Sequence, residues 1–387
     1  MKGQNMKISL ELQPCLKNKS GIGIYTYELS KRLQEYNYIT LYGDIFNFIN
    51  RNNIEKDIDG LNFNKNIFSL FPYGVYRRMW NYVPIRYNWL FNDQSDIYHF
   101  FNFIVPPRIE GKVITTIHDM TYELYPETMD KKNLKRIKSD IHYSVNRADK
   151  IITVSESSKN DIMKFLSVDE AKIEIVYNGV EYDKFNKSYS EDEKSKIRVK
   201  YTLPKNYILY MGTLEPRKNI ESIIEAFSLF KKENTVSNQN TKLVIAGKKG
   251  WLFENIFNLV NKLSLKDDVI FTDYIDENDK SIIYNMASLF VFPSLYEGFG
   301  IPVLEAMASS VPVITSNVSS LPEVAGDAAI LVEPKDIKSI AKYMSKVLAD
   351  KKLRNNLIRE GHEQAKKFTW ESSAKKLVNI YRDLYNK

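Results

Sequence analysis

Residues 291–305 read Val-Phe-Pro-Ser-Leu-Tyr-Glu-Gly-Phe-Gly-Ile-Pro-Val-Leu-Glu, and they determine the fold around them. A short apolar run ends in proline, a turn with Gly298 and Gly300 follows, and a helix is predicted directly after it. Such a strand–turn–helix presents backbone N–H groups and the positive end of a helix dipole to an anion. Glu297 and Glu305, with seven residues between them, add acceptors for hydroxyl groups. Phosphate donors flanked by hydroxyl acceptors predict a nucleotide-sugar site.

The composition is that of a globular protein. The chain has 387 residues, 43% of them hydrophobic and 27% charged, which suits two or three domains. Its single cysteine, Cys15, excludes an internal disulfide, and the four dispersed histidines predict no structural zinc site. The first 14 residues are too short and too charged for a signal peptide, and no apolar run approaches 18 residues. We therefore expect a cytoplasmic protein without a spanning helix.

The charge pattern argues against a nucleic-acid binder. The net charge is only +7, and basic residues alternate with acidic ones along most of the chain. One segment differs, Lys-Lys-Asn-Leu-Lys-Arg-Ile-Lys at residues 131–138. As a helix, it would be either a solvated surface helix or a positive face in peripheral contact with anionic lipid at the inner face of the membrane.

Apolar, β-branched runs alternate with helical patterns along the chain. The strands expected from these runs are 8–10, 113–117, 150–154 and 173–176 in the first half, and 207–211, 243–246, 269–272, 289–292 and 312–315 in the second. Continuous apolar strands separated by helices predict parallel sheets that are covered on both faces. Two such series predict an α/β protein of two doubly wound, Rossmann-like domains.

A polar stretch separates the two series. Residues 188–196, Ser-Tyr-Ser-Glu-Asp-Glu-Lys-Ser-Lys, precede a new strand. We therefore expect a first domain over 1–183, a linker over 184–204, a second domain over 205–369 and a final helical segment over 370–387. Ligands of open α/β sheets lie beyond the carboxyl ends of the strands, so we expect the substrate between the two domains.

Several motifs occur in a fixed order. They are Glu-Gly-Phe-Gly-Ile-Pro-Val-Leu-Glu (297–305), Tyr-Met-Gly-Thr-Leu-Glu-Pro-Arg-Lys-Asn (210–219), Ser-Ser-Leu-Pro-Glu-Val-Ala-Gly-Asp-Ala-Ala (319–329), Ala-Asp-Lys-Ile-Ile-Thr-Val-Ser (148–155) and Asn-Gly-Val (178–180). Together they resemble the retaining glycosyltransferases of family 4, also called group 1. The resemblance implies the GT-B fold, in which two Rossmann-like domains face each other across a cleft. It makes the first domain the acceptor side and the second the donor side, with the last helix crossing back to the first domain.

The resemblance assigns four residues to the chemistry. Arg217 and Lys218 would neutralise the departing diphosphate, the guanidinium by bidentate contact and the ammonium as a compact charge. Glu297 would read a hydroxyl of the donor sugar. His118, after the strand 113–117, would donate to a sugar hydroxyl or shield charge at the anomeric carbon. The structural alternatives are a basic helix cap, a surface loop acid and a structural histidine.

Donor binding is assigned in the same way, to Gly23, Gly247, Tyr274, Gly298, Phe299, Gly300 and Glu305. The N–H groups of Phe299 and Gly300 would meet the diphosphate, and Glu305 would accept from the ribose, although it is also placed as an acid of the first helical turn. Two positions depart from the family. Thr213 replaces a common arginine, and Asp273 replaces a common glycine near the nucleobase, so the base stays open.

The acceptor residues are assigned more loosely, to Gly21, Asn102 and Asp119. Residues 71–103 are rich in aromatic side chains, which either stack on acceptor sugars or fill a core. Arg77 and Arg78 lie among them, where they are candidates to meet a lipid-linked diphosphate.

The predicted function is a retaining glycosyltransferase that moves a hexose from a nucleotide sugar to a glycan or lipid-linked glycan in surface polysaccharide synthesis. The form of the 210–219 motif resembles mannosyltransferases, so GDP-mannose is the first donor considered, with a UDP-sugar as the alternative. No cofactor or metal is expected, because the basic pair would neutralise the leaving group. The alternatives are a non-catalytic binding subunit of a glycan-assembly complex and another GT-B enzyme, such as a nucleotide-sugar epimerase.

Overall fold

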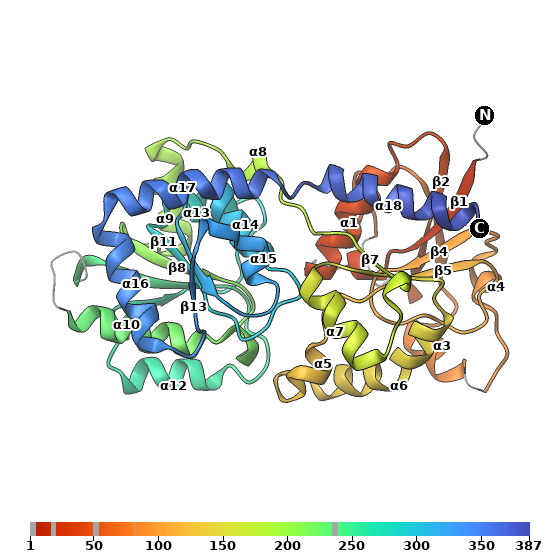
Figure 1. Cartoon of the computed structure of the whole chain (residues 1–387), viewed down its shortest axis with the longest axis horizontal. Helices are drawn as coiled ribbons and strands as arrows, with labels where there is room; N and C mark the ends of the chain where they lie inside the picture. The colour runs from red at the N-terminus through yellow and green to blue at the C-terminus, as the bar shows by residue number, and fades with distance from the viewer. Residues whose placement is uncertain (1–4, 17–20, 49–53, 81, 234–238) are drawn as a thin grey trace. The chain divides into compact units, whose positions relative to one another are not determined.

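The computed structural model describes residues 5–16, 21–48, 54–80, 82–233 and 239–387. The chain divides into two compact units (Figure 1). The first unit comprises Met1–Leu124, Lys131–Asn178 and Trp370–Lys387, and the second comprises Tyr125–Asp130 and Gly179–Thr369.

The first unit contains a parallel sheet of seven strands in the order β3-β2-β1-β4-β5-β6-β7. Its strands are β1 (Met6–Glu11), β2 (Ile39–Phe46), β3 (Asn64–Phe68), β4 (Ile97–Phe100), β5 (Lys112–Thr116), β6 (Lys150–Thr153) and β7 (Ile173–Ile175). The central strands are almost wholly buried, as their continuous apolar sequences predict. The register of the sheet places Ile8 of β1 opposite Leu41 of β2 and Ile97 of β4.

Helices cover both faces of this sheet. They are α1 (Gly21–Leu33), α2 (Ile54–Asp57), α3 (Tyr73–Met79), α4 (Tyr87–Phe91), α5 (Thr121–Leu124), α6 (Lys131–Arg147), α7 (Glu156–Leu166) and α18 (Trp370–Tyr385). Helices α1 and α18 lie on one face, and α3, α6 and α7 lie on the other (Figure 1). The basic segment 131–138 is the first half of α6, with Ile137 turned into the core and most of its lysines exposed.

The second unit contains a parallel sheet of six strands in the order β10-β9-β8-β11-β12-β13. Its strands are β8 (Tyr207–Met211), β9 (Lys242–Ala246), β10 (Val269–Phe271), β11 (Leu289–Phe292), β12 (Val313–Ser316) and β13 (Ile330–Val332). Its helices are α8 (Tyr182–Phe185), α9 (Glu191–Tyr201), α10 (Ile220–Lys232), α12 (Glu254–Lys262), α13 (Lys280–Met286), α14 (Ile301–Ala308), α15 (Leu321–Ala325), α16 (Ile337–Ala349) and α17 (Lys351–Lys366).

Each sheet has a point where the strand order reverses. In the first sheet the chain passes from β1 to β2 on one side and later returns to β4 on the other. In the second sheet the same reversal separates β8 from β11. Because the loops that follow two such strands run in opposite directions, they leave a crevice at the carboxyl end of the sheet. Both crevices therefore mark candidate sites, and the two predicted Rossmann-like domains are confirmed.

The predicted linker over 184–204 is corrected by the structure. Most of it is helix α9, which belongs to the second unit. A capping box fixes its start, since Ser190 Oγ accepts from the Glu193 backbone while the Glu193 carboxylate accepts from the Ser190 backbone. The segment is polar because it is an exposed helix, which composition alone does not distinguish from a linker. The main part of the second unit begins directly after Asn178 of the first unit, whereas the predicted domain boundary was at 183.

The segment 370–387 groups with the first unit, although it follows the second in the chain. Trp370 packs edge-on against Tyr25 of α1, and the Tyr381 hydroxyl lies 2.6 Å from His99 Nδ1 on β4. Trp370 and Tyr381 are both buried. The helix therefore completes one face of the first sheet.

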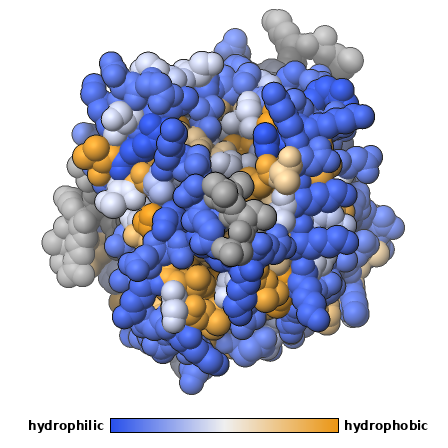
Figure 2. Space-filling view, turned by 90° about the vertical axis from the view of Figure 1, so that its left-hand side faces the viewer, coloured by the Kyte–Doolittle hydropathy of each residue, from blue (hydrophilic) through white to orange (hydrophobic). Residues whose placement is uncertain are grey.

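None of the helices in the described residues is long and apolar enough to cross a membrane. The surface seen in Figure 2 is mainly hydrophilic, with scattered hydrophobic areas.

Candidate active site

The site of the second unit is built on the two loops that meet at its strand-order reversal. After β8, the chain reaches the short 3₁₀ turn Pro216–Lys218 and then α10. After β11, it forms the glycine turn and α14. The two loops are hydrogen-bonded to each other, since Leu295 N donates to Arg217 O at 2.9 Å and Asn219 Nδ2 donates to Pro293 O at 2.9 Å. Residues 78 and 74 positions apart in the chain are thereby held together.

Four charged side chains form one buried cluster here. Lys218 Nζ lies 2.6 Å from one oxygen of Glu297, and an Arg217 nitrogen lies 2.8 Å from the other. A second nitrogen of Arg217 lies 2.6 Å from Glu215, which the sequence did not single out. Two cations face two carboxylates, so the cluster is close to neutral. The side chains are 15% exposed at most, so water screens their interactions weakly.

This environment holds Glu297 ionised. Burial alone would raise the pKa of its carboxyl, but the charges of Arg217 and Lys218 outweigh burial and lower the pKa to about 2. The carboxylate in turn orients both cations. The structure thus brings together three of the four residues predicted to carry the chemistry.

The glycine turn is fixed by the serines of the 319–329 motif. Ser320 Oγ hydrogen-bonds the carbonyls of both Glu297 and Phe299, and the Glu297 N–H donates to Ser319 Oγ at 3.0 Å. Gly300 has φ 115°, and a Cβ there would lie 2.7 Å from Leu321. Gly298, Phe299 and Gly300 are all buried in the turn that leads into α14. The backbone path toward the helix start therefore needs glycine at 300.

Glu305 lies one turn into α14 and is also buried. Its Oε2 accepts from the Tyr284 hydroxyl at 3.0 Å, and Lys280 lies near enough to interact. Burial raises the pKa of Glu305, while the charge of Lys280 opposes that rise. Two side chains of α13 therefore hold this carboxylate, which the sequence assigned to the ribose.

Gly247 and Tyr274 lie near the ends of β9 and β10. A Cβ on Gly247 would lie 1.9 Å from Gly212 O, so this close passage of two loops requires glycine. The Gly247 N–H donates to Asp273 O at 2.9 Å. Asp273, at the position where relatives commonly have glycine, adopts φ 55°, the left-handed conformation that glycine favours. Tyr274 is 47% exposed.

The remaining predicted residues lie in the first unit. His118 follows β5, is buried, and places Nε2 2.8 Å from Phe101 O. Since a carbonyl can only accept, Nε2 carries the proton and Nδ1 of the neutral ring is an acceptor. Burial lowers the pKa of His118 and favours this neutral form. In this tautomer the free ring nitrogen can accept a hydrogen bond but cannot donate one, whereas the predicted shielding of charge at the anomeric carbon needs no donor.

Asp119 caps the following helix, because its Oδ1 accepts from the Thr121 N–H at 2.9 Å. Gly21 and Gly23 are in the first turn of α1, with Gly21 exposed and Gly23 buried. A Cβ on Gly21 would meet nothing within 4 Å. Ser20, directly before Gly21, is outside the described residues.

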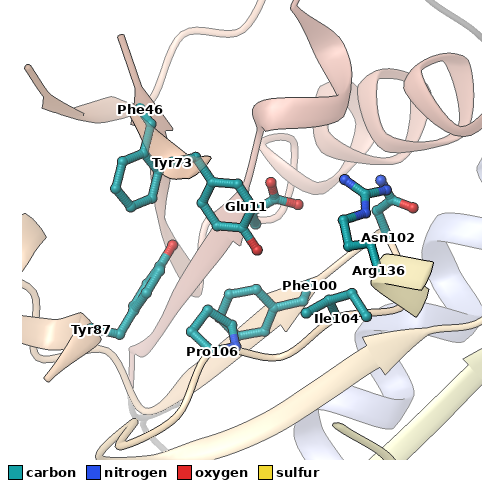
Figure 3. Close-up of a pocket in the computed structure, with 9 residues that line it drawn as sticks. All are labelled: Glu11, Phe46, Tyr73, Tyr87, Phe100, Asn102, Ile104, Pro106 and Arg136. Atoms are coloured by element: carbon teal, nitrogen blue, oxygen red, sulfur yellow. The ribbon is translucent and has the colours of Figure 1, made fainter. Parts of the chain in front are cut away.

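Asn102 follows β4 and lines a pocket at the strand-order reversal of the first sheet (Figure 3). Glu11, the last residue of β1, and Arg136 of α6 line it as well. Most aromatic side chains of the 71–103 region are buried in the core, which was one of the two roles considered for them. Tyr82 and Trp89 are exposed. Arg77 pairs with Asp140 at 2.7 Å.

Known proteins with similar sequences identify the family. Residues 192–364 match the family model described as glycosyl transferases group 1, and residues 19–184 match that of glycosyltransferase family 4. The chain is 32% identical over 385 residues to the O-antigen chain mannosyltransferase B of Escherichia coli, covering 97% of this chain and 100% of the relative. The chain belongs to the family 4, or group 1, glycosyltransferases.

Other relatives of this glycosyltransferase agree. It is 34% identical over 233 residues to the O-antigen chain mannosyltransferase RfbU of Salmonella typhimurium, covering 60% of each chain. The fold is shared with the sucrose-phosphate synthase of Thermosynechococcus elongatus, at 18% identity and a TM-score of 0.74 over 98% of this chain and 99% of the other. It is also shared with WaaG, a glycosyltransferase involved in lipopolysaccharide biosynthesis, at 18% identity and a TM-score of 0.70 over 97% and 99%. The predicted family and fold are confirmed.

Four residues of the glycosyltransferase were missed from sequence. They are Glu215, Tyr284, Glu11 and Arg136. Glu215 had a signal, since an acid two residues before Arg217 is within reach of its guanidinium. Glu11 also had one, as an acid that ends an apolar strand. Tyr284 lies on a helix with no local motif, and Arg136 lies in the basic segment 131–138, which by itself predicts no pocket. Only the tertiary structure places these two side chains.

Among the described residues, no group of three or more histidine, cysteine, aspartate or glutamate side chains is placed to hold a metal ion.

Proposed function

We propose that this glycosyltransferase transfers a mannosyl group, with retention of configuration, from a nucleotide diphosphate sugar to a glycan or lipid-linked glycan of a surface polysaccharide. GDP-mannose is the first donor to test. The observation that carries the proposal is the buried cluster of Arg217, Lys218 and Glu297 beside the turn that leads into α14. The full-length similarity to an O-antigen chain mannosyltransferase supports the choice of mannose and of the acceptor class.

In this mechanism the donor diphosphate competes with Glu297 for the two cations. Arg217 and Lys218 then stabilise the negative charge that grows on the diphosphate as its bond to the anomeric carbon breaks. Glu297, turned from the cations, becomes an acceptor for a hydroxyl of the donor sugar. Because the two cations hold its pKa at about 2 before the donor binds, Glu297 is ionised at neutral pH when the donor arrives.

The acceptor oxygen forms the new bond on the face from which the diphosphate departs. The proton of the acceptor hydroxyl passes to the departing diphosphate, so no carboxylate nucleophile is required. Glu305 binds the ribose through the oxygen that Tyr284 leaves available. Neutral His118 accepts from a hydroxyl of the donor sugar through Nδ1.

The direct test is a panel of GDP, UDP and ADP with their mannose and glucose derivatives. Thermal unfolding of the whole chain is followed with each compound. A ligand at one hundred times its dissociation constant stabilises by about 2.7 kcal/mol. Release of the nucleoside diphosphate and transfer of labelled sugar are then measured with the best donor. If no nucleoside diphosphate or its sugar stabilises the chain, the donor assignment fails.

We also propose that the glycosyltransferase works in the cytoplasm and contacts anionic membrane through the exposed lysines of α6. Lys131, Lys132 and Lys135 are exposed on this helix. Co-sedimentation with vesicles containing 30% anionic lipid tests the contact. Replacing the three lysines with glutamine is expected to abolish it, whereas replacing exposed Lys351 and Lys352 of α17 serves as the control. Equal sedimentation of both variants would exclude α6 as the contact.

A further inference from the structure

The pocket of the first unit lies where an open α/β sheet offers its ligand site. It is lined by residues at the carboxyl ends of three neighbouring strands, Glu11 of β1, Phe46 of β2 and Phe100 of β4 (Figure 3). Strands β1 and β4 flank the reversal of strand order. The donor cluster occupies the corresponding reversal in the second sheet. The first sheet therefore has its own site at the position that topology favours.

The polar groups of this pocket come from three elements. Glu11 ends β1, Asn102 follows β4 and Arg136 lies on α6. The Nε of Arg136 is buried and has no hydrogen-bond partner among the described residues. A buried guanidinium nitrogen without a partner is costly, so a ligand that accepts from it would recover that cost. Arg136 is also close enough to Glu11 for its charge to act on the carboxyl.

Aromatic rings form the remaining walls. Phe46, Tyr73, Tyr87 and Phe100 line the pocket beside the polar groups. Aromatic walls with a few convergent polar groups are typical of sites for small organic ligands, and aromatic faces pack against the C–H surfaces of sugars. The cavity measures about 30 Å³, which is roughly the space of two water-sized groups. It therefore admits the edge of a sugar and leaves the rest of the ring outside.

We propose that this pocket binds one edge of a neutral sugar residue of the acceptor, through two neighbouring hydroxyls that reach Glu11 and Arg136. The inference rests on the proposed transferase function and names the part of the acceptor that the first unit recognises. A hydroxyl both donates and accepts, so it can bond the Glu11 carboxyl in either protonation state. A fully ionised phosphate only accepts, so it could bond Glu11 only when that carboxyl holds a proton. Burial raises the pKa of Glu11 to about 8, so both states occur near neutral pH.

The experiment measures binding of defined probes to the whole chain without donor. The probes are methyl α-mannoside, methyl α-glucoside and methyl α-galactoside, together with their 6-phosphates, observed by saturation-transfer NMR and titration calorimetry. Glu11→Gln and Arg136→Met are expected to raise the dissociation constant of the preferred neutral glycoside at least tenfold. Asn102→Ala, in the loop at the pocket, is a milder variant. The matched controls are Glu35→Gln and Arg359→Met, which change exposed residues of the same kinds.

The readouts separate this inference from the proposed function. If the pocket variants lose glycoside binding while keeping nucleotide binding and a normal melting temperature, the inference stands, even if no donor supports transfer. If the 6-phosphates bind more tightly than the neutral glycosides, the ligand class is wrong. Absence of glycoside binding by the parent chain, or equal binding by the pocket variants and the controls, would overturn the site itself.

Discussion

At the scale of single residues, Glu297 has the most consequential contacts. It was predicted to read a sugar hydroxyl, while the neighbouring cations were predicted to bind phosphate. In the structure one carboxylate oxygen faces each cation. These roles are compatible because a diphosphate and a carboxylate are alternative partners for the same pair. Ion pairing within the cluster keeps both cations oriented before any ligand binds.

Lys218→Ala is expected to lower the rate of sugar transfer about 100- to 1000-fold, because it removes one preorganised charge from the leaving group. Arg217→Ala should act similarly, and the double variant should lose less than the product of both effects, since both cations meet one diphosphate. Turnover is measured by nucleoside diphosphate release, with exposed Lys352→Ala as control. Near-normal turnover in folded Lys218→Ala would make the pair a helix cap.

Glu305→Ala is expected to weaken nucleotide binding about tenfold, because it removes a ribose acceptor. Lys280 keeps its ion pair with Glu277. Tyr284→Phe removes only the hydrogen bond to Oε2 and is expected to change affinity less. Titration calorimetry with the nucleoside diphosphate gives both values. An unchanged dissociation constant in Glu305→Ala would remove this residue from the donor site.

At the scale of elements, the loops after β8 and β9 pass so closely that only glycine fits. Gly247→Ala is expected to destabilise the second unit by about 3 kcal/mol or to prevent its folding, because its Cβ would lie 1.9 Å from Gly212 O. Gly21→Ala, in the open first turn of α1, is the matched control and is expected to be neutral or to stabilise by up to about 1 kcal/mol. Urea unfolding followed by circular dichroism compares them. Equal stability of the two variants would contradict the close passage.

Two carboxyls near strand ends of the first sheet, Asp44 and Glu11, make the stability of the fold depend on pH. Burial raises the pKa of Asp44 to about 7, despite its hydrogen bonds with Ser9 and Asn66, and raises that of Glu11 to about 8. The folded state therefore keeps protons that the unfolded chain loses near pH 4. This contribution to stability is complete below that pH and is lost as pH rises through 7 to 8.

The loss for Asp44 is on the order of 2–4 kcal/mol. Buried His99 and His118, whose pKa values are lowered, act in the opposite direction over this range, so the effect of Asp44 is seen by comparison. Between pH 5 and pH 8 we expect the melting temperature of the parent to fall relative to that of Asp44→Asn. Thermal melts in buffers of equal ionic strength measure this difference. A pH-independent difference between the parent and Asp44→Asn would contradict the buried, protonated carboxyl.

At the scale of the whole molecule, the first unit is completed by a helix encoded after the second. Deletion of 370–387 would uncover the surface that Trp370, Leu377 and Tyr381 bury and would leave His99 without its tyrosine partner. We expect this deletion to lower or abolish the unfolding transition of the first unit while that of the second persists. Differential scanning calorimetry of the full chain and of the deletion variant compares the unfolding transitions of the two units, and deletion of 386–387 serves as the control. Unchanged transitions would refute the role of α18.

Transfer by the whole enzyme is expected to persist in excess EDTA, since Arg217 and Lys218 supply the positive charge for the leaving diphosphate. Turnover is compared with and without chelator and after adding manganese. Complete loss in chelator that manganese restores would replace this mechanism with a metal-assisted one.

The sequence by itself determined the fold class and the family, and it pointed to most of the residues of one candidate site. Strands such as 207–211 and 289–292 could be predicted because parallel strands buried on both faces are continuous apolar runs. The turn at 297–305 could be predicted because its glycines and acids lie close together in the sequence. Strands β2, β3 and β4 were missed, since polar residues interrupt them or aromatic-rich helices surround them, and β13, which has only three residues, was missed as well.

Only the tertiary structure decided which distant side chains meet. It paired Glu297 with Arg217 and Lys218, placed Glu11 beside Arg136 from another element, and returned α18 to the first unit. It also fixed the protonated nitrogen of His118 through a backbone carbonyl 17 residues away. Local patterns specify which elements form, because propensity and burial act over a few residues. Contacts between elements depend on sheet order and register, which bring together residues that no local pattern connects.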